Sequence, residues 1–115
     1  MKVIYTSYFG NWRKWSTVEH PPVSIANFPP KGFSGKKYPK LFPDLKYLDA
    51  LKKGDMTKEE FREAYLKDLS KLDPHKVYED LDQHILVCYE KSCDFCHRHI
   101  VAEWLRSYGY QVEEL

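Results

Sequence analysis

The sequence has no long hydrophobic run, no strong excess of one charge and few cysteines. No segment approaches the roughly 20 consecutive apolar residues of a transmembrane helix. The N-terminal stretch MKVIYTSYFGNW is too short and too mixed for a signal peptide, so we expect a cytoplasmic protein. The net charge of +1 argues against the global basic field that duplex-binding proteins usually carry.

The cysteine content excludes another class of protein. Three cysteines are an odd number, which argues against a full disulfide framework. In the cytoplasm we expect all of them to be reduced. The chain of 115 residues has no internal repeat and no domain boundary, so residues 1–115 are predicted to form a single domain.

Apolar patterns predict strands that alternate with helices. The run Ile85 to Tyr89 is continuously apolar, as expected of a strand buried on both faces, and the sequence TKEE at 57–60 is a capping box. Strands separated by helices favour an α/β domain, a three-layer α/β/α sandwich with a small, mostly parallel sheet. The expected strands cover 3–5, 23–26, 85–89 and 110–112, the expected helices 43–54, 57–72, 74–81 and 96–107, and residues 27–43 form a long loop.

Three loops should meet at the carboxyl edge of this sheet, where open α/β sheets bind their ligands. They contain the sequences TSYFGNWR, NFPPKGFSGKKY and EKSCDFCHR. The third loop leads into a helix whose apolar residues place His97 on the inward face and His99 nearly opposite. The two histidines therefore do not converge on one ligand.

The stretch CYEKSCDFCHRH allows several kinds of chemistry. Cys93 and Cys96 have the spacing of half a zinc site, which only an unusual arrangement with Cys88 and His97 would complete, so we assign no metal ligand and expect no cofactor. Cys96 at a helix start could instead be a reactive thiolate, with His97 as its base and Glu90 in support. The alternative is structural: His97 would donate to a backbone carbonyl in the core, and Arg98 would pair with Glu90.

Three segments together resemble a known family. They are IYTSYFGN at the start, VSIANFPPKGF in the middle and ILVCYEKSCDFCHRHIVAEWL near the end. They resemble the prokaryotic domain-of-unknown-function family numbered 488, which includes the YeaO-like proteins. The resemblance implies a compact α/β domain with its motif residues at one sheet edge, and a role related to nucleotides or nucleic acids. The family's second strand often ends in an Asp-Val-Arg-like sequence, which Ile25-Ala26-Asn27 replaces here.

Our leading hypothesis is an anion-binding pocket at this edge, for a nucleotide or a nucleic-acid phosphate. Thiol-dependent catalysis by Cys96 and a structural zinc-binding or interaction domain are the alternatives. The partner would be a nucleotide or single-stranded nucleic acid and not a membrane. The candidate catalytic residues are Cys96, His97 and Glu90, and the candidate ligand-binding residues are Arg98, Arg13, Asn27, Lys31 and Tyr8.

Overall fold

A computed structural model of the chain, which describes residues 3–89 and 97–115, contains one parallel β-sheet. The five strands lie in the order β3-β2-β4-β1-β5, and every pair is parallel. The elements are β1 (Ile4–Tyr8), α1 (Trp12–Trp15), β2 (Pro22–Ser24), β3 (Lys36–Lys37), α2 (Leu45–Lys53), α3 (Lys58–Leu69), α4 (Pro74–Leu81), β4 (Ile85–Cys88), α5 (His97–Ser107) and β5 (Val112–Glu114), with 3-10 turns at Phe9–Asn11 and Pro39–Leu41.

The central strand is β4, whose residues are all fully buried. It pairs with β1 on one side, where Tyr8 is opposite Cys88, and with β2 on the other, where Ser24 is opposite Val87. A continuous apolar run is stable in this position because helices or loops cover both faces of the strand. The prediction of a doubly buried strand is confirmed for Ile85–Cys88, whereas Tyr89, its predicted last residue, lies outside the strand and is 51% exposed.

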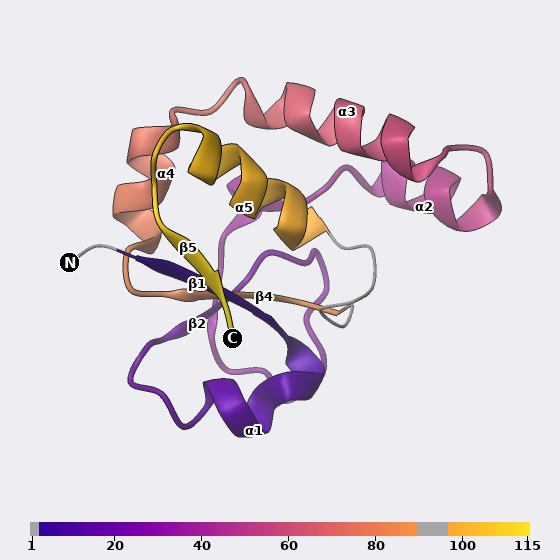
Figure 1. Ribbon diagram of the computed structural model, residues 1–115. Coiled ribbons are helices and arrows are strands. Elements are labelled where there is room, and N and C mark those ends of the chain that lie inside the picture. The colour runs from indigo at the N-terminus through magenta and orange to yellow at the C-terminus, as the bar shows by residue number, and fades with distance from the viewer. Residues whose placement is uncertain (1–2, 90–96) are drawn as a thin grey trace.

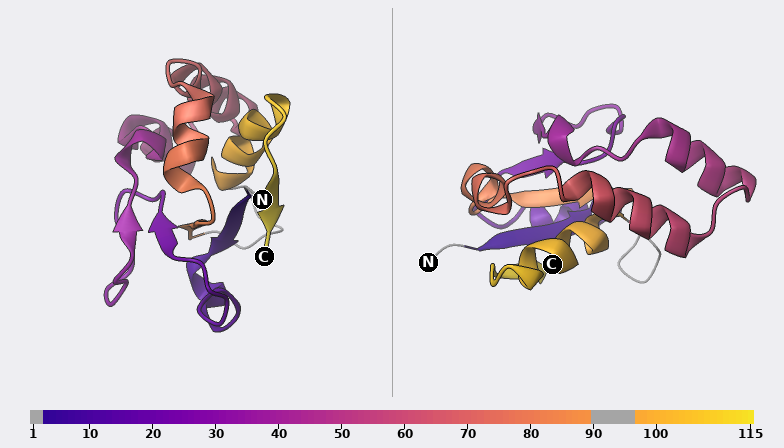
Figure 2. Two further views of the ribbon diagram at one scale, coloured as in Figure 1. Left: turned by 90° about the vertical axis from the view of Figure 1, so that its left-hand side faces the viewer. Right: turned by 90° about the horizontal axis from the view of Figure 1, so that it is seen from above.

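The two faces of the sheet are covered differently (Figures 1 and 2). On one face, Leu86 and Cys88 belong to a core that includes residues of α3, α4 and α5. On the other face, Ile85 and Val87 pack with Phe9 of the first connection, and partly buried side chains of α1 and of the loop after β2 complete the cluster. The predicted α/β fold is confirmed, with one outer layer of helices and a second made of α1 and loops.

Local sequence signals set most helix boundaries. The Thr57 side chain accepts from the backbone of Glu60, and the Glu60 side chain accepts from the backbone of Thr57, so the capping box is formed. The backbone of Gly54 at the end of α2 has a φ of 81°, which glycine adopts without strain. Helix α2 begins two residues later than predicted because the Asp44 side chain caps it by accepting from Lys46 N.

The remaining differences concern the strands and the connections between them. Strand β1 continues through Thr6 and Ser7, which the sequence assigned to a loop, because both side chains are buried and hydrogen-bonded. The residues after it form a 3-10 turn and α1. The long loop contains the short strand β3, β2 covers Pro22–Ser24 rather than 23–26, and β5 covers Val112–Glu114 rather than 110–112. In the part of the chain described, no helix has the length and apolarity needed to cross a membrane.

Candidate functional site

Strands β1, β2 and β4 end at the same edge of the sheet, and helix α5 begins beside it. The first two residues of this helix, His97 and Arg98, are both buried, with relative exposures of 7% and 0%. His97 contacts the end of β2, whereas Arg98 contacts β4, β1 and β5. The two consecutive side chains therefore contact opposite sides of the edge, His97 the β2 side and Arg98 the β1 and β5 side.

His97 is held as a neutral donor. Its Nε2 lies 2.7 Å from the carbonyl oxygen of Ile25, and because a carbonyl can only accept, Nε2 carries the proton. Burial lowers the pKa of His97 to about 4, and the Ile25 carbonyl opposes that shift only in part. Its ring packs edge-on against Tyr65, with 5.7 Å between the ring centres. These contacts match the structural alternative considered for this histidine.

A pocket of about 330 Å³ opens beside His97. Phe28 and Tyr89, which follow β2 and β4, are 69% and 51% exposed, and the Tyr89 hydroxyl donates to the Phe28 carbonyl. Within the described residues, the Oδ1 atom of Asn27 is buried and has no hydrogen-bond partner. We call this the edge pocket; it is lined by Ala26, Asn27, Phe28, Pro43, Leu45, Leu48, Asp49, Lys52, Tyr89 and His97.

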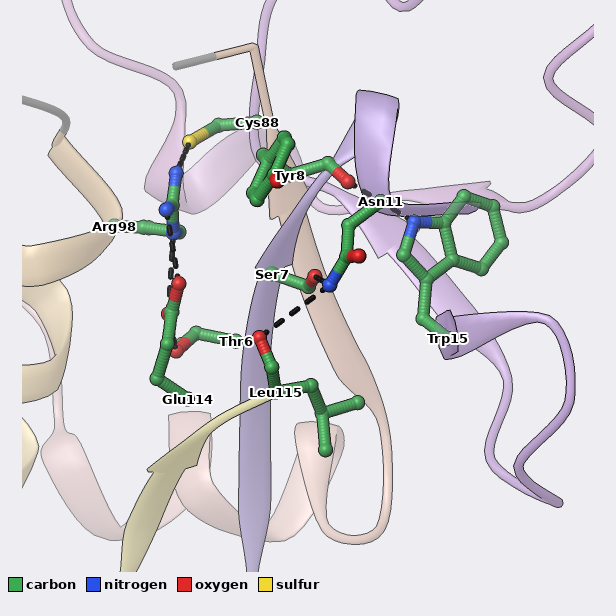
Figure 3. A network of polar contacts seen from close by, with 9 residues as sticks. All are labelled: Thr6, Ser7, Tyr8, Asn11, Trp15, Cys88, Arg98, Glu114 and Leu115. Carbon is green, nitrogen blue, oxygen red and sulfur yellow. Dashed lines mark hydrogen bonds and ion pairs between the residues drawn. The ribbon is translucent and has the colours of Figure 1, made fainter. Parts of the chain in front are cut away.

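Arg98 lies in a closed network on the other side of the edge (Figure 3). Its Nε and Nη2 donate to the two carboxylate oxygens of Glu114, at 3.2 and 2.9 Å, and the Thr6 hydroxyl donates to the same carboxylate. The guanidinium carbon lies 5.6 Å from the centre of the Tyr8 ring. A bidentate carboxylate is the geometry that an arginine fork prefers, so Arg98 has its counter-charge within the chain.

Cys88 also belongs to this network. Nη1 of Arg98 donates to Cys88 Sγ at 2.9 Å, and Cys88 is fully buried. Cys88 is also disulfide-bonded, and its partner cysteine lies outside the described residues. The expectation that all the cysteines are reduced is therefore wrong for Cys88.

A second set of contacts links β1 to the chain after it (Figure 3). Asn11 Nδ2 donates to Ser7 Oγ at 3.1 Å and to the Leu115 carbonyl at 3.4 Å. The indole nitrogen of Trp15 donates to the Tyr8 carbonyl at 3.0 Å. These bonds fix α1 against the end of β1.

The structure divides the predicted site residues into three groups. Asn27 and His97 line the edge pocket, and Tyr8 lies against Arg98 in the closed network. The third group is exposed: Arg13 stacks on Trp12, and Lys31 lies in the loop after β2.

Glu90, Cys93 and Cys96 lie outside the described residues. The proposed pair between Glu90 and Arg98 thus has no description, whereas Glu114 is an observed partner of Arg98. Among the residues that the structure does describe, no group of three His, Cys, Asp or Glu side chains could hold a metal ion.

Sequence reasoning missed several residues of this edge. Glu114 was overlooked because its role depends on β5 pairing beside β1. Asp49 and Lys52 line the edge pocket from α2. They were missed because nothing in the local sequence indicates that α2 lies nearer to this edge than the other helices do. Phe28 carried a usable signal, since it follows shortly after a predicted strand, whereas Tyr89 was predicted to be the last residue of a buried strand.

The fold and this edge define a small parallel α/β protein with a ligand-sized pocket at the carboxyl ends of its strands. A family model described as the active DUF488-N3 subclade matches residues 10–109, and the chain belongs to this domain-of-unknown-function family. The predicted family resemblance is therefore confirmed. No curated protein and no solved structure matches the chain.

Proposed function

We propose that this protein binds a nucleotide in the edge pocket. The observation that carries the proposal is a ligand-sized pocket lined by two exposed aromatic rings, Phe28 and Tyr89. Nucleobases have flat faces that stack on aromatic side chains.

The charges around the edge pocket support the same class of ligand. Lys52 is exposed on α2 and supplies a cation for a phosphate, and Asp49, whose Oδ2 pairs with Lys53, supplies an acceptor through its other oxygen. His97 is neutral at physiological pH because of its low pKa, so it adds a polar wall without adding charge. The pocket volume of about 330 Å³ is at the small end for ligand sites, which favours one base rather than a large cofactor.

The cation that binds the anion in this proposal is not the one that the sequence-based hypothesis named. Arg98 is fully buried and bidentate to Glu114, so Lys52 replaces it as the cation nearest the ligand. The catalytic roles of Cys96 and Glu90 remain predictions. They are supported by the description of the matching subclade as active.

Titration calorimetry with the four ribonucleoside monophosphates, ribose 5-phosphate and inorganic phosphate tests the proposal. We expect at least one nucleotide to bind more tightly than either base-free compound. Phe28→Ala should weaken that binding about tenfold, because loss of one stacked aromatic costs about 1–3 kcal/mol. Lys52→Ala should weaken it by a smaller factor.

Matched controls are available on exposed parts of the chain. Tyr108→Ala removes an aromatic ring that is 58% exposed near the end of α5, and Lys67→Ala removes an exposed cation of α3. Neither variant should change the affinity. The proposal is wrong if no nucleotide binds, if phosphate alone binds as tightly, or if Phe28→Ala and Tyr108→Ala behave alike.

A further inference from the structure

A second pocket lies on the loop-covered face of the sheet. It has a volume of about 290 Å³ and is built largely from aromatic rings. Phe33 packs edge-on against Phe9 and Trp15, with ring centres 5.3 and 6.4 Å apart, and Trp12 is 55% exposed. We call it the aromatic pocket; it is lined by Phe9, Trp12, Trp15, Pro30, Gly32 and Phe33.

The side chain of Tyr89 lies between the two pockets. Tyr89 lines the edge pocket, and its ring centre lies 4.8 Å from that of Phe9, which lines the aromatic pocket. The loop after β2 supplies both pockets as well, because Phe28 lines the first and Pro30 the second. The pockets are therefore neighbours at the same edge, separated by a wall that includes Tyr89 and Phe9.

Charge is divided unequally along the chain, although the net charge is near zero. Residues 1–43 contain seven Lys or Arg and one Glu, a net charge of +6, whereas residues 44–115 contain eleven Lys or Arg and sixteen Asp or Glu, a net charge of −5. The first segment includes α1 and the loop that line the aromatic pocket, on the side of the sheet away from α3 and α5 (Figure 1). Exposed cations of this segment follow or flank the lining residues: Arg13, Lys14 and Lys31.

Aromatic rings interleaved with cations are the usual surface for single-stranded nucleic acid, since every base can stack and every phosphate carries charge. Arg13 already lies over the Trp12 ring, 5.6 Å from its centre, so a cation and a stacking surface are held together. An acidic peptide would use the cations and leave the rings without a function. The combination of two base-sized pockets and local positive charge therefore favours a polynucleotide.

We propose that the two pockets take neighbouring bases of a single-stranded nucleic acid. The edge pocket holds one base between Phe28 and Tyr89, the aromatic pocket holds the next against Trp12, and Arg13, Lys14 and Lys31 contact phosphates. The inference rests on the proposed function, because it extends the same site from a mononucleotide to a strand.

The test compares a mononucleotide with a strand of eight nucleotides that contains the same base. Calorimetry measures the mononucleotide, and fluorescence anisotropy measures a labelled oligonucleotide. We expect the oligonucleotide to bind at least about tenfold more tightly, since a second stacked base and further phosphates contribute. Trp12→Ala should remove most of this gain and leave mononucleotide affinity unchanged, whereas Phe28→Ala should weaken both.

The cations are tested by the salt dependence of oligonucleotide binding. The slope of log affinity against log salt should fall by about 0.7 for each phosphate contact removed, as in Arg13→Ala or Lys31→Ala. Lys67→Ala on α3 is the matched control and should leave the slope unchanged.

The outcomes separate the two proposals. If no mononucleotide binds, the proposed function itself fails. If a mononucleotide binds but the oligonucleotide is no tighter, or if Trp12→Ala and Tyr108→Ala behave alike, the strand proposal fails and the proposed function stands. If poly-glutamate displaces the oligonucleotide at an equal concentration of charge, the aromatic pocket does not select bases and the strand proposal is overturned.

Discussion

His97 and Arg98 are neighbours in the sequence and both are buried, yet the structure stabilises them by different means. His97 is neutral, donates to a backbone carbonyl of the β2 side and borders a pocket. Arg98 is charged, binds both oxygens of Glu114 and lies in a closed network on the β1 and β5 side. We call the β2 side, where the edge pocket lies, the open side of the edge. We call the β1 and β5 side, which Arg98 and Glu114 fill, the closed side.

His97 and Arg98 are stabilised by different means because the two sides of the edge offer different hydrogen-bond acceptors. Imidazole can lose its charge on burial, so a carbonyl is a sufficient acceptor. A guanidinium cannot lose its charge in a protein and needs an anion beside it when it is buried. Glu114, with a side chain 28% exposed, provides that anion at the end of β5. The last strand therefore completes the closed side, and the edge pocket is left on the open side.

The largest expected effect comes from breaking the closed side. Arg98→Ala leaves Glu114 without its cation and removes a fully buried side chain, which should lower the free energy of unfolding by about 3 kcal/mol. Urea denaturation followed by circular dichroism at pH 7 measures this change. The samples should contain no reductant, so that the disulfide of Cys88 is the same in every variant.

An exposed pair of the same residue types is the control for Arg98→Ala. Arg62 on α3 binds Glu103 on α5, with side chains 48% and 55% exposed. Arg62→Ala should cost at most about 1 kcal/mol, because solvent and salt screen surface ion pairs. Equal losses for the two variants would show that Arg98 is no more than a surface cation in energetic terms.

The sequence predicted those parts of the fold that depend on short-range signals. The run from Ile85 identified the central strand, the capping box at Thr57 located the start of α3, and Gly54 located the end of α2. Strand β3 was missed because Lys36 and Lys37 are polar and exposed, and only their pairing with β2 makes them a strand. Long-range pairing leaves no periodic pattern in so short a segment.

The site was predictable to a smaller extent for the same reason. Helix phasing correctly placed His97 on the inward face of α5. Arg98, a predicted ligand-binding residue, is fully buried. The cause is Glu114, which lies 16 residues further along the chain and reaches Arg98 only because β5 pairs with β1. Spacing within one helix carries no information about that contact.

The open side should be sensitive to acid through His97. Its pKa is lowered from 6.5 in the unfolded chain to about 4 in the folded protein, so the unfolded state binds the proton first. The stabilisation is complete above pH 6.5 and is lost as the pH falls toward 4, by a total of about 3 kcal/mol. Urea denaturation at a series of pH values between 4 and 7 measures the loss.

His97→Gln isolates this contribution from the carboxyl groups that titrate in the same range. The Gln amide can still donate to the Ile25 carbonyl but cannot be protonated. The difference in unfolding free energy between wild type and His97→Gln should therefore shrink as the pH falls below 6.5. A difference that stays constant between pH 7 and pH 4 would mean that burial does not depress the pKa of His97.

The smallest expected effect concerns the hydroxyl that supports Glu114. Thr6→Val keeps the shape of a buried side chain but removes the donor to the Glu114 carboxylate, and it should cost about 1 kcal/mol. Thr17→Val is the matched control, because the exposed Thr17 hydroxyl donates only to the nearby Lys14 carbonyl and its loss should change stability by less than about 0.5 kcal/mol.

A double-mutant cycle decides whether Thr6 acts through Glu114. In the Glu114→Gln background, the amide is a weaker acceptor than the carboxylate, so Thr6→Val should cost less than it does in wild type. If the cost is the same in both backgrounds, the Thr6 hydroxyl does not act through the carboxylate. The contacts of the Arg98 guanidinium with Glu114, Cys88 and Tyr8 would then be independent of the Thr6 hydroxyl.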